Sequence, residues 1–125
     1  MLERSGKYFL LPLKYFEISD VVWDGLVTLL FNDPKNSQLD IHGEFLVGSD
    51  EVFERYSPRS EWIENVLESF IGVEIKVAKA NSKGYLFITF ADKREIIVED
   101  GPFENWHYTN TDKIFVHGGV GRLTY

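Results

Sequence analysis

The sequence predicts an α+β fold in which one central helix packs on a mostly antiparallel sheet of about seven strands. Three observations predict it. A strand-like pattern occurs twice, with an offset of 59 residues, and one helical segment separates the two copies. The chain of 125 residues, 44% of them hydrophobic, is long enough to bury one core. We therefore expect a single domain over residues 1–125.

The repeated pattern is a glycine followed six residues later by Phe and after two more residues by Asp, at 25–33 and again at 84–92. Both copies are apolar at consecutive positions, which is typical of strands covered on both faces. Asp- and Asn-containing segments follow each copy and predict turns. We expect two similar β-units, over 13–45 and 72–108.

A helix is predicted over residues 57–72, between the two units. Ser57 or Ser60 can cap its start, Pro58 is tolerated in a first turn, and Gly72 can end it. Apolar residues recur at helical spacing, and we expect them to face the sheet and cover one of its sides. These residues are Trp62, Ile63, Val66, Leu67, Phe70 and Ile71.

The last segment, 113–125, is expected to form a C-terminal hairpin that turns at Gly118-Gly119. Before it, residues 101–108 carry several aromatic rings. Trp106 either packs in the core or stands at an edge where a partner can reach it, and the same alternatives apply to His107.

The charge of the chain is concentrated in one place. Its net charge is −7 and its pI about 4.9, which disfavours direct binding of nucleic acid, because phosphates require clustered basic groups. Eight acids and only two arginines lie between Asp40 and Glu68, so that segment carries −6. This segment is either a solvated polar face or a docking surface for a basic protein.

The docking interpretation assigns the candidate partner-binding residues. Exposed acids would pair with Lys and Arg of the partner, while aromatic side chains would anchor it. The assigned residues are Asp50, Glu51, Glu54, Tyr56, Glu61, Glu64, Glu68 and Trp106.

Sequence patterns of catalysis are missing. The chain has no cysteine, no Gly-x-Ser-x-Gly turn and no phosphate-binding glycine loop. Its three histidines, at positions 42, 107 and 117, could meet in space, but a hydrogen-bonded structural or surface histidine is the commoner case. We expect no enzyme activity, catalytic residues, cofactor or metal.

The N-terminal residues lack the pattern of a signal peptide, and the apolar stretches are far shorter than the roughly 20 residues that span a bilayer. We expect a cytoplasmic protein with no membrane contact, either a monomer or a weak dimer.

Two motifs carry a family resemblance. Phe103-Glu104-Asn105-Trp106 matches a Tyr/Phe-Glu-x-Trp element, and His117-Gly118-Gly119 matches a Pro-Gly-Gly element in which His117 replaces Pro. Over residues 13–125 the chain resembles DUF6188, a family of small bacterial proteins. That resemblance implies an immunity protein of a bacterial polymorphic or contact-dependent toxin system, with no catalytic residues.

The sequence therefore predicts an immunity protein that binds and blocks a cognate toxin domain, which we expect to be a basic nuclease. Two alternatives remain. One is a small-ligand-binding module on a concave sheet face around Trp106 and His107. The other is a subunit of a larger complex, or a homodimer formed through an edge strand.

Overall fold

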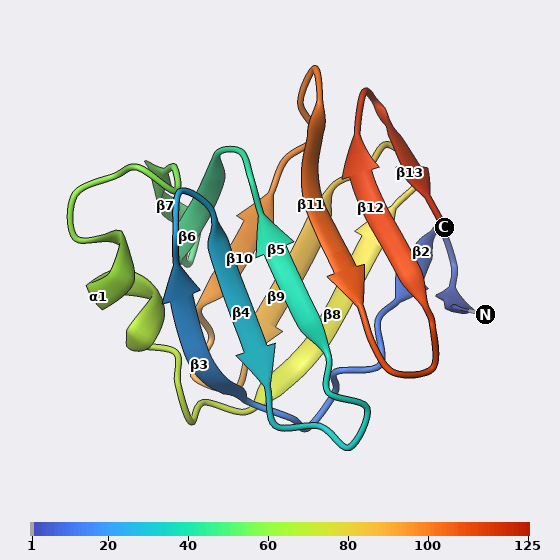
Figure 1. Ribbon diagram of the computed structural model, residues 1–125, viewed down its shortest axis with the longest axis horizontal. Helices are drawn as coiled ribbons and strands as arrows, with labels where there is room; N and C mark the ends of the chain where they lie inside the picture. Colours follow the sequence, from blue (N-terminus) through green and yellow to red (C-terminus); the bar gives the residue numbers. More distant parts are fainter. Residues whose placement is uncertain (1) are drawn as a thin grey trace.

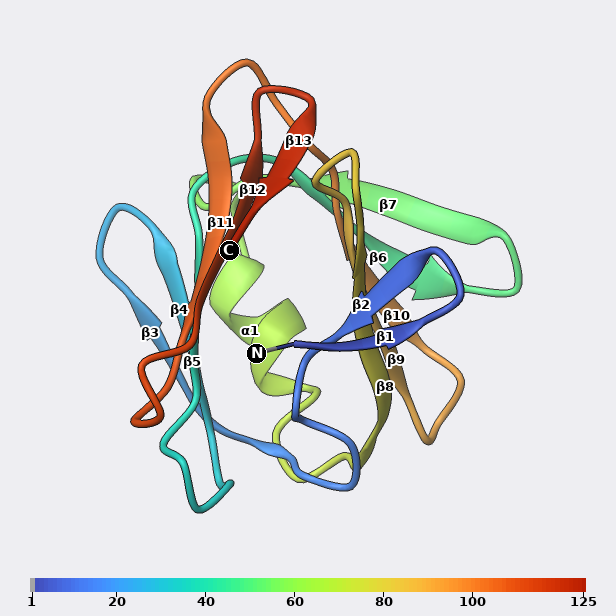
Figure 2. The ribbon, with the colours of Figure 1, turned by 90° about the vertical axis from the view of Figure 1, so that its right-hand side faces the viewer.

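The computed structural model describes residues 2–125, which form two antiparallel sheets packed face to face (Figures 1 and 2). The seven-stranded sheet contains, in spatial order, β1 (Glu3–Ser5), β2 (Tyr8–Leu10), β8 (Ile75–Asn81), β9 (Leu86–Phe90), β10 (Glu95–Val98), β6 (Phe45–Ser49) and β7 (Val52–Tyr56). The six-stranded sheet contains β13 (Arg122–Thr124), β12 (Phe115–Gly119), β11 (Glu104–Thr109), β5 (Gln38–Ile41), β4 (Val27–Phe31) and β3 (Ile18–Trp23). The mostly antiparallel character is confirmed, but the prediction of one sheet is wrong.

The chain changes sheet three times, first after β2 and then twice more, so its strands are divided between two sheets. After β5 it crosses over, and β6 pairs with β10 of the opposite layer. After β10 it crosses back, and β11 pairs with β5. The expected first unit, 13–45, thus contributes β3–β5 to the six-stranded sheet, whereas the second, 72–108, contributes β8–β10 to the seven-stranded sheet and β11 to the six-stranded one.

Each sheet has one buried and one outer face, so the expectation that the central strands are covered on both sides is wrong. In β4 and β9, buried and partly exposed residues alternate. Leu29 and Ile88 point inward and are fully buried. The opposite sheet, and not a helix, covers these inner faces, as Figure 2 shows edge-on. The largest fully buried side chains are Trp106, Tyr108, Phe45, Phe70 and Phe90.

The helix is much shorter than predicted. Helix α1 spans only Ile63–Glu68 and lies at the end of the sandwich beside β3, between the two layers (Figures 1 and 2). It does not begin earlier because Trp62 has a left-handed backbone, with φ of 65°, that an α-helix does not contain. The helix ends at Glu68 and not at Gly72, which has a left-handed backbone, with φ of +82°, but lies four residues beyond the helix end. Among residues 2–125, no helix has the length and apolar character required to span a membrane.

Arg94 fixes the end of α1 to the sandwich. Its guanidinium group lies 3.9 Å from the centre of the Phe70 ring and donates hydrogen bonds to the side chain and carbonyl oxygens of Ser69, at 2.8 and 3.0 Å. Ile63 and Leu67 are buried on the inner side of the helix. A segment of less than two turns is therefore anchored by packing rather than by its own length.

The glycine pair expected to form the last turn lies instead within β12. A Cβ atom at Gly118 would overlap the carbonyl oxygen of Gly84 and the indole of Trp106, so only glycine fits there. The turn between β12 and β13 is made by Val120 and Gly121, which have φ of 56° and 72°.

Candidate protein-binding site

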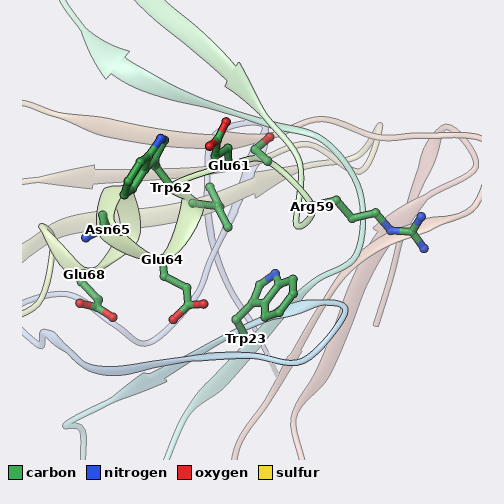
Figure 3. Close-up of a pocket in the computed structure, with 9 residues that line it drawn as sticks. Trp23, Arg59, Glu61, Trp62, Glu64, Asn65 and Glu68 are labelled. Atoms are coloured by element: carbon green, nitrogen blue, oxygen red, sulfur yellow. The ribbon is translucent and has the colours of Figure 1, made fainter.

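An open groove of about 550 Å³ lies beside α1 (Figure 3). It is formed where the end of β3, the loop before α1 and the outer side of α1 meet. The residues that line it are Trp23, Arg59, Ser60, Glu61, Trp62, Ile63, Glu64, Asn65 and Glu68. We call it the α1 groove.

Two exposed tryptophans distinguish the α1 groove. The Trp62 side chain is 71% exposed and that of Trp23 is 46% exposed. Trp62 also has a positive φ, which is unfavourable for a bulky residue and places the indole outside the helix. The indole N–H of Trp23 donates a hydrogen bond to the carbonyl oxygen of Pro58. Large apolar rings held in solvent in this way are typical of binding anchors.

Three predicted acids lie at the same groove. Glu61, Glu64 and Glu68 are exposed, and none of them forms an ion pair with another residue in the range 2–125. Figure 3 shows Glu64 and Glu68 pointing to the side on which Trp23 lies, whereas the guanidinium of Arg59 extends away from them. The groove therefore combines unneutralised carboxylates with aromatic surface.

The other predicted acids lie elsewhere. Asp50 and Glu51 form the tight turn of the β6–β7 hairpin, both with positive φ. Figure 2 shows this hairpin tip directed away from α1. Glu54 belongs to β7, where it accepts a hydrogen bond from the Tyr56 hydroxyl at 2.7 Å. The acidic segment of the sequence is thus divided into two surfaces.

The two predicted aromatic anchors are not free rings on the surface. Tyr56 is partly buried beside Phe45, and its hydrogen bond to Glu54, aided by burial, raises the pKa of its hydroxyl. Trp106 is fully buried, and its indole N–H donates to the Gly84 carbonyl oxygen at 2.8 Å. Assigning Trp106 to a binding surface is therefore corrected: the alternation along β11 turns it into the core.

The sequence assigns no binding role to Trp23, and it leaves Trp62 open, either as an aromatic anchor among the acids or as part of the helix core. The helical spacing of Trp62 from Val66 and Phe70 predicts a place on the buried side of a longer helix. The left-handed backbone of Trp62 changes the direction of its side chain, and no pattern in the sequence predicts that backbone conformation. For Trp23 the available signal was its position beside the turn at Asp24-Gly25, where strand ends are exposed.

A separate cluster of histidines and one carboxylate lies on the outer face of the six-stranded sheet. Glu104 contacts both His107 Nε2, at 2.6 Å, and His117 Nδ1, at 2.7 Å. The hydrogen bond with His107, together with the nearby charges of His107, His117 and His42, lowers the pKa of the Glu104 carboxyl. Within residues 2–125, Glu104, His107 and His117 form a group whose ligand atoms lie close enough together to hold a metal ion.

Comparison with protein-family models, with curated proteins and with solved structures found no match to this chain. The interpretation of both sites accordingly rests on their residues and arrangement.

Proposed function

We propose that this protein is a cytosolic immunity protein without catalytic activity, which binds a cognate bacterial toxin domain at the α1 groove. The toxin domain would be a basic nuclease, and its active site would be blocked by stoichiometric occlusion. The observation that carries this proposal is the pairing of exposed Trp23 and Trp62 with the carboxylates of Glu61, Glu64 and Glu68.

Charge complementarity indicates the kind of partner. A nuclease that binds phosphates presents Lys and Arg around its active site. The free carboxylates of the α1 groove offer those cations the same sign of charge as phosphate, and opposite potentials accelerate encounter and reject wrong partners. A partner of strongly acidic character would instead be repelled.

The two indoles would supply most of the affinity. Exposed acids alone give modest and salt-sensitive attraction, because water and ions screen them. Trp side chains bury large apolar area at interfaces and dominate binding energy when they are enclosed. Trp23 is already held by Pro58, and the backbone fixes the direction of Trp62, so little ordering is required on binding.

The resemblance to the DUF6188 family supports the same proposal, since that family implies toxin immunity. The small-ligand alternative depended on an accessible Trp106, and the burial of this side chain removes its main support. We therefore keep the protein-binding interpretation.

The decisive experiment is calorimetric titration of the full chain with the toxin domain encoded beside it. We expect one-to-one binding that weakens at least tenfold when Glu64→Lys and Glu68→Lys are combined. The matched control combines Asp50→Lys and Glu51→Lys, which changes the net charge equally at the hairpin tip. Similar losses for both variants would show only a general charge effect, and unchanged affinity after reversal of Glu64 and Glu68 would refute the groove as the site.

We also propose that the scaffold consists of two related β-units. Two features support this proposal. The first is a bulge after the first residue of β3 and of β8, at Ile18 and Ile75. The second is the order of the strands. Each three-strand meander, β3–β5 and β8–β10, is followed by a hairpin that crosses to the other sheet, namely β6–β7 and β11–β12.

A further inference from the structure

All three histidines of the chain meet on the outer face of the six-stranded sheet. His107 of β11 lies directly opposite His117 of β12, with ring centres 5.4 Å apart. His42, just after β5, lies against the other side of His107, with ring centres 5.0 Å apart. Residues separated by up to 75 positions in the sequence thus form one row across three neighbouring strands.

A β-bulge adds a carboxylate to this row. In a regular strand, residues 104 and 107 would point to opposite faces, because side chains alternate. The register of β11 against β12 shifts between Glu104 and Trp106, and this bulge turns Glu104 to the same outer face as His107. Bulges that redirect a side chain are common beside functional sites.

The donor atoms converge on one point. The two carboxylate oxygens of Glu104 face a ring nitrogen of His107 and a ring nitrogen of His117. One ligand atom from each of these three residues lies within 4.8 Å of the other two. The side chains remain 31–47% exposed, so an ion can enter and can keep water as a further ligand.

We propose that Glu104, His107 and His117 form a binding site for one divalent transition-metal ion, zinc being the ion that their donor set suits best. Two imidazoles and one carboxylate are a combination that zinc accepts in tetrahedral sites, at about 2.0–2.2 Å from each donor. Calcium and magnesium prefer oxygen ligands alone. The fourth position is taken by water or by His42.

Binding of the metal ion would replace the contacts of Glu104 with His107 and His117 by bonds from each of these side chains to the ion. The ring nitrogens that now face Glu104 bind the ion without a proton, so a neutral imidazole carries its proton on the other ring nitrogen, and an imidazolium would release one proton to solvent. The bound ion would link β11 to β12 through side chains in addition to the backbone ladder. The metal site is spatially separate from the α1 groove, since β5 and β4 lie between this cluster and β3.

The test uses the full chain, free of any polyhistidine tag, titrated with zinc by calorimetry and with cobalt by visible absorption. We expect one equivalent per chain and the intense absorption bands of low-coordinate cobalt. Glu104→Gln and His117→Gln should each weaken zinc binding at least tenfold. Glu74→Gln, which removes an exposed carboxylate beside the other sheet, is the matched control and should bind zinc like the unaltered chain.

Two results would overturn the proposal. One is an unaltered chain that takes up neither zinc nor cobalt, and the other is zinc affinity that survives the double change Glu104→Gln and His107→Gln. Where a variant fails to fold, ring-proton NMR signals of the unaltered chain decide. Zinc-induced changes at His107 and His117 support the site, and changes confined to residues outside this cluster contradict it.

Discussion

The indole N–H of Trp23 donates a hydrogen bond to the carbonyl oxygen of Pro58, and so joins the end of β3 to the loop that leads into α1. This contact spans 35 residues of sequence and holds one wall of the α1 groove against the other. It connects the stability of a sheet edge with the shape of the proposed binding site.

Replacing Trp23→Phe removes the donor but keeps an aromatic ring. We expect the free energy of unfolding to fall by about 1 kcal/mol, the usual net contribution of one such hydrogen bond. Binding of the toxin domain should weaken as well, because the loop before α1 is no longer fixed. Urea denaturation and calorimetry measure the two effects. Val22→Ala, at the neighbouring exposed position, is the control, and equal binding by Trp23→Phe would contradict the proposed role.

Replacing Trp62 should affect stability and partner binding in opposite directions. A left-handed backbone costs a non-glycine residue about 1–2 kcal/mol, and glycine avoids that cost. Because the Trp62 ring is mostly exposed, its loss removes little packing. We expect Trp62→Gly to be as stable as the unaltered chain or more stable, by up to about 1 kcal/mol, while toxin binding weakens strongly.

Trp62→Ala is the matched variant, since it removes the ring but keeps the side-chain penalty of the left-handed backbone. Both variants should lose binding to the same extent, and only the glycine variant should gain stability in urea denaturation. A large loss of stability in both would show that Trp62 packs as a core residue, against the proposed role.

The sequence located several strands but neither their number, which is thirteen within residues 2–125 rather than about seven, nor their distribution between two sheets. Runs of apolar residues and the turn residues beside them locate β4 and β9, because both depend on local chemistry. Which strand pairs with which depends on crossings after β5 and β10, and a run that is apolar on both faces does not reveal them.

For the two sites, too, the sequence predicts some features, and tertiary packing determines the others. The exposure of Glu61, Glu64 and Glu68 follows from their charge alone, because charged side chains remain on the surface wherever the chain folds, and their role in binding stays a proposal. The sequence left open the inward direction of Trp106 and the exposure of Trp62, and it did not predict the contact of Glu104 with His107. They depend on strand phase, a positive φ and a bulge, which are fixed by tertiary packing.

Gly118→Ala tests the packing between the sheets. The added methyl group would overlap the Gly84 carbonyl and the Trp106 indole, and the hydrogen bond between these two groups would be strained or lost. We expect a destabilisation of about 2–3 kcal/mol, in the upper range for overpacked cores. Urea denaturation measures it, and tryptophan fluorescence should shift to longer wavelength as water reaches Trp106. Thr109→Ala, at a partly exposed position of β11, is the control, and an equally small effect of both changes would contradict this account.

Tyr108 should control stability at alkaline pH. Its hydroxyl lies 2.6 Å from Ser37 Oγ, which in turn donates to the buried carboxylate of Asp33 at 2.6 Å. Burial raises the pKa of the Tyr108 hydroxyl above its ordinary value of 10.0. The unfolded chain therefore loses this proton at lower pH than the folded chain does. The contribution of the Tyr108 hydroxyl to the free energy of unfolding is fully present below pH 10, and it is lost as the pH rises through the pKa of this group in the folded state.

Tyr108→Phe removes the titrating group, so its stability should depend less on pH above 10 than that of the unaltered chain. At neutral pH the variant should be less stable by about 1–2 kcal/mol, because the Ser37 hydroxyl loses a buried partner. Urea midpoints measured from pH 8 to 11 test both expectations. Tyr15→Phe, at an exposed position, is the control and should follow the unaltered chain. Parallel pH profiles for Tyr108→Phe and the unaltered chain would show that another group governs the alkaline loss of stability.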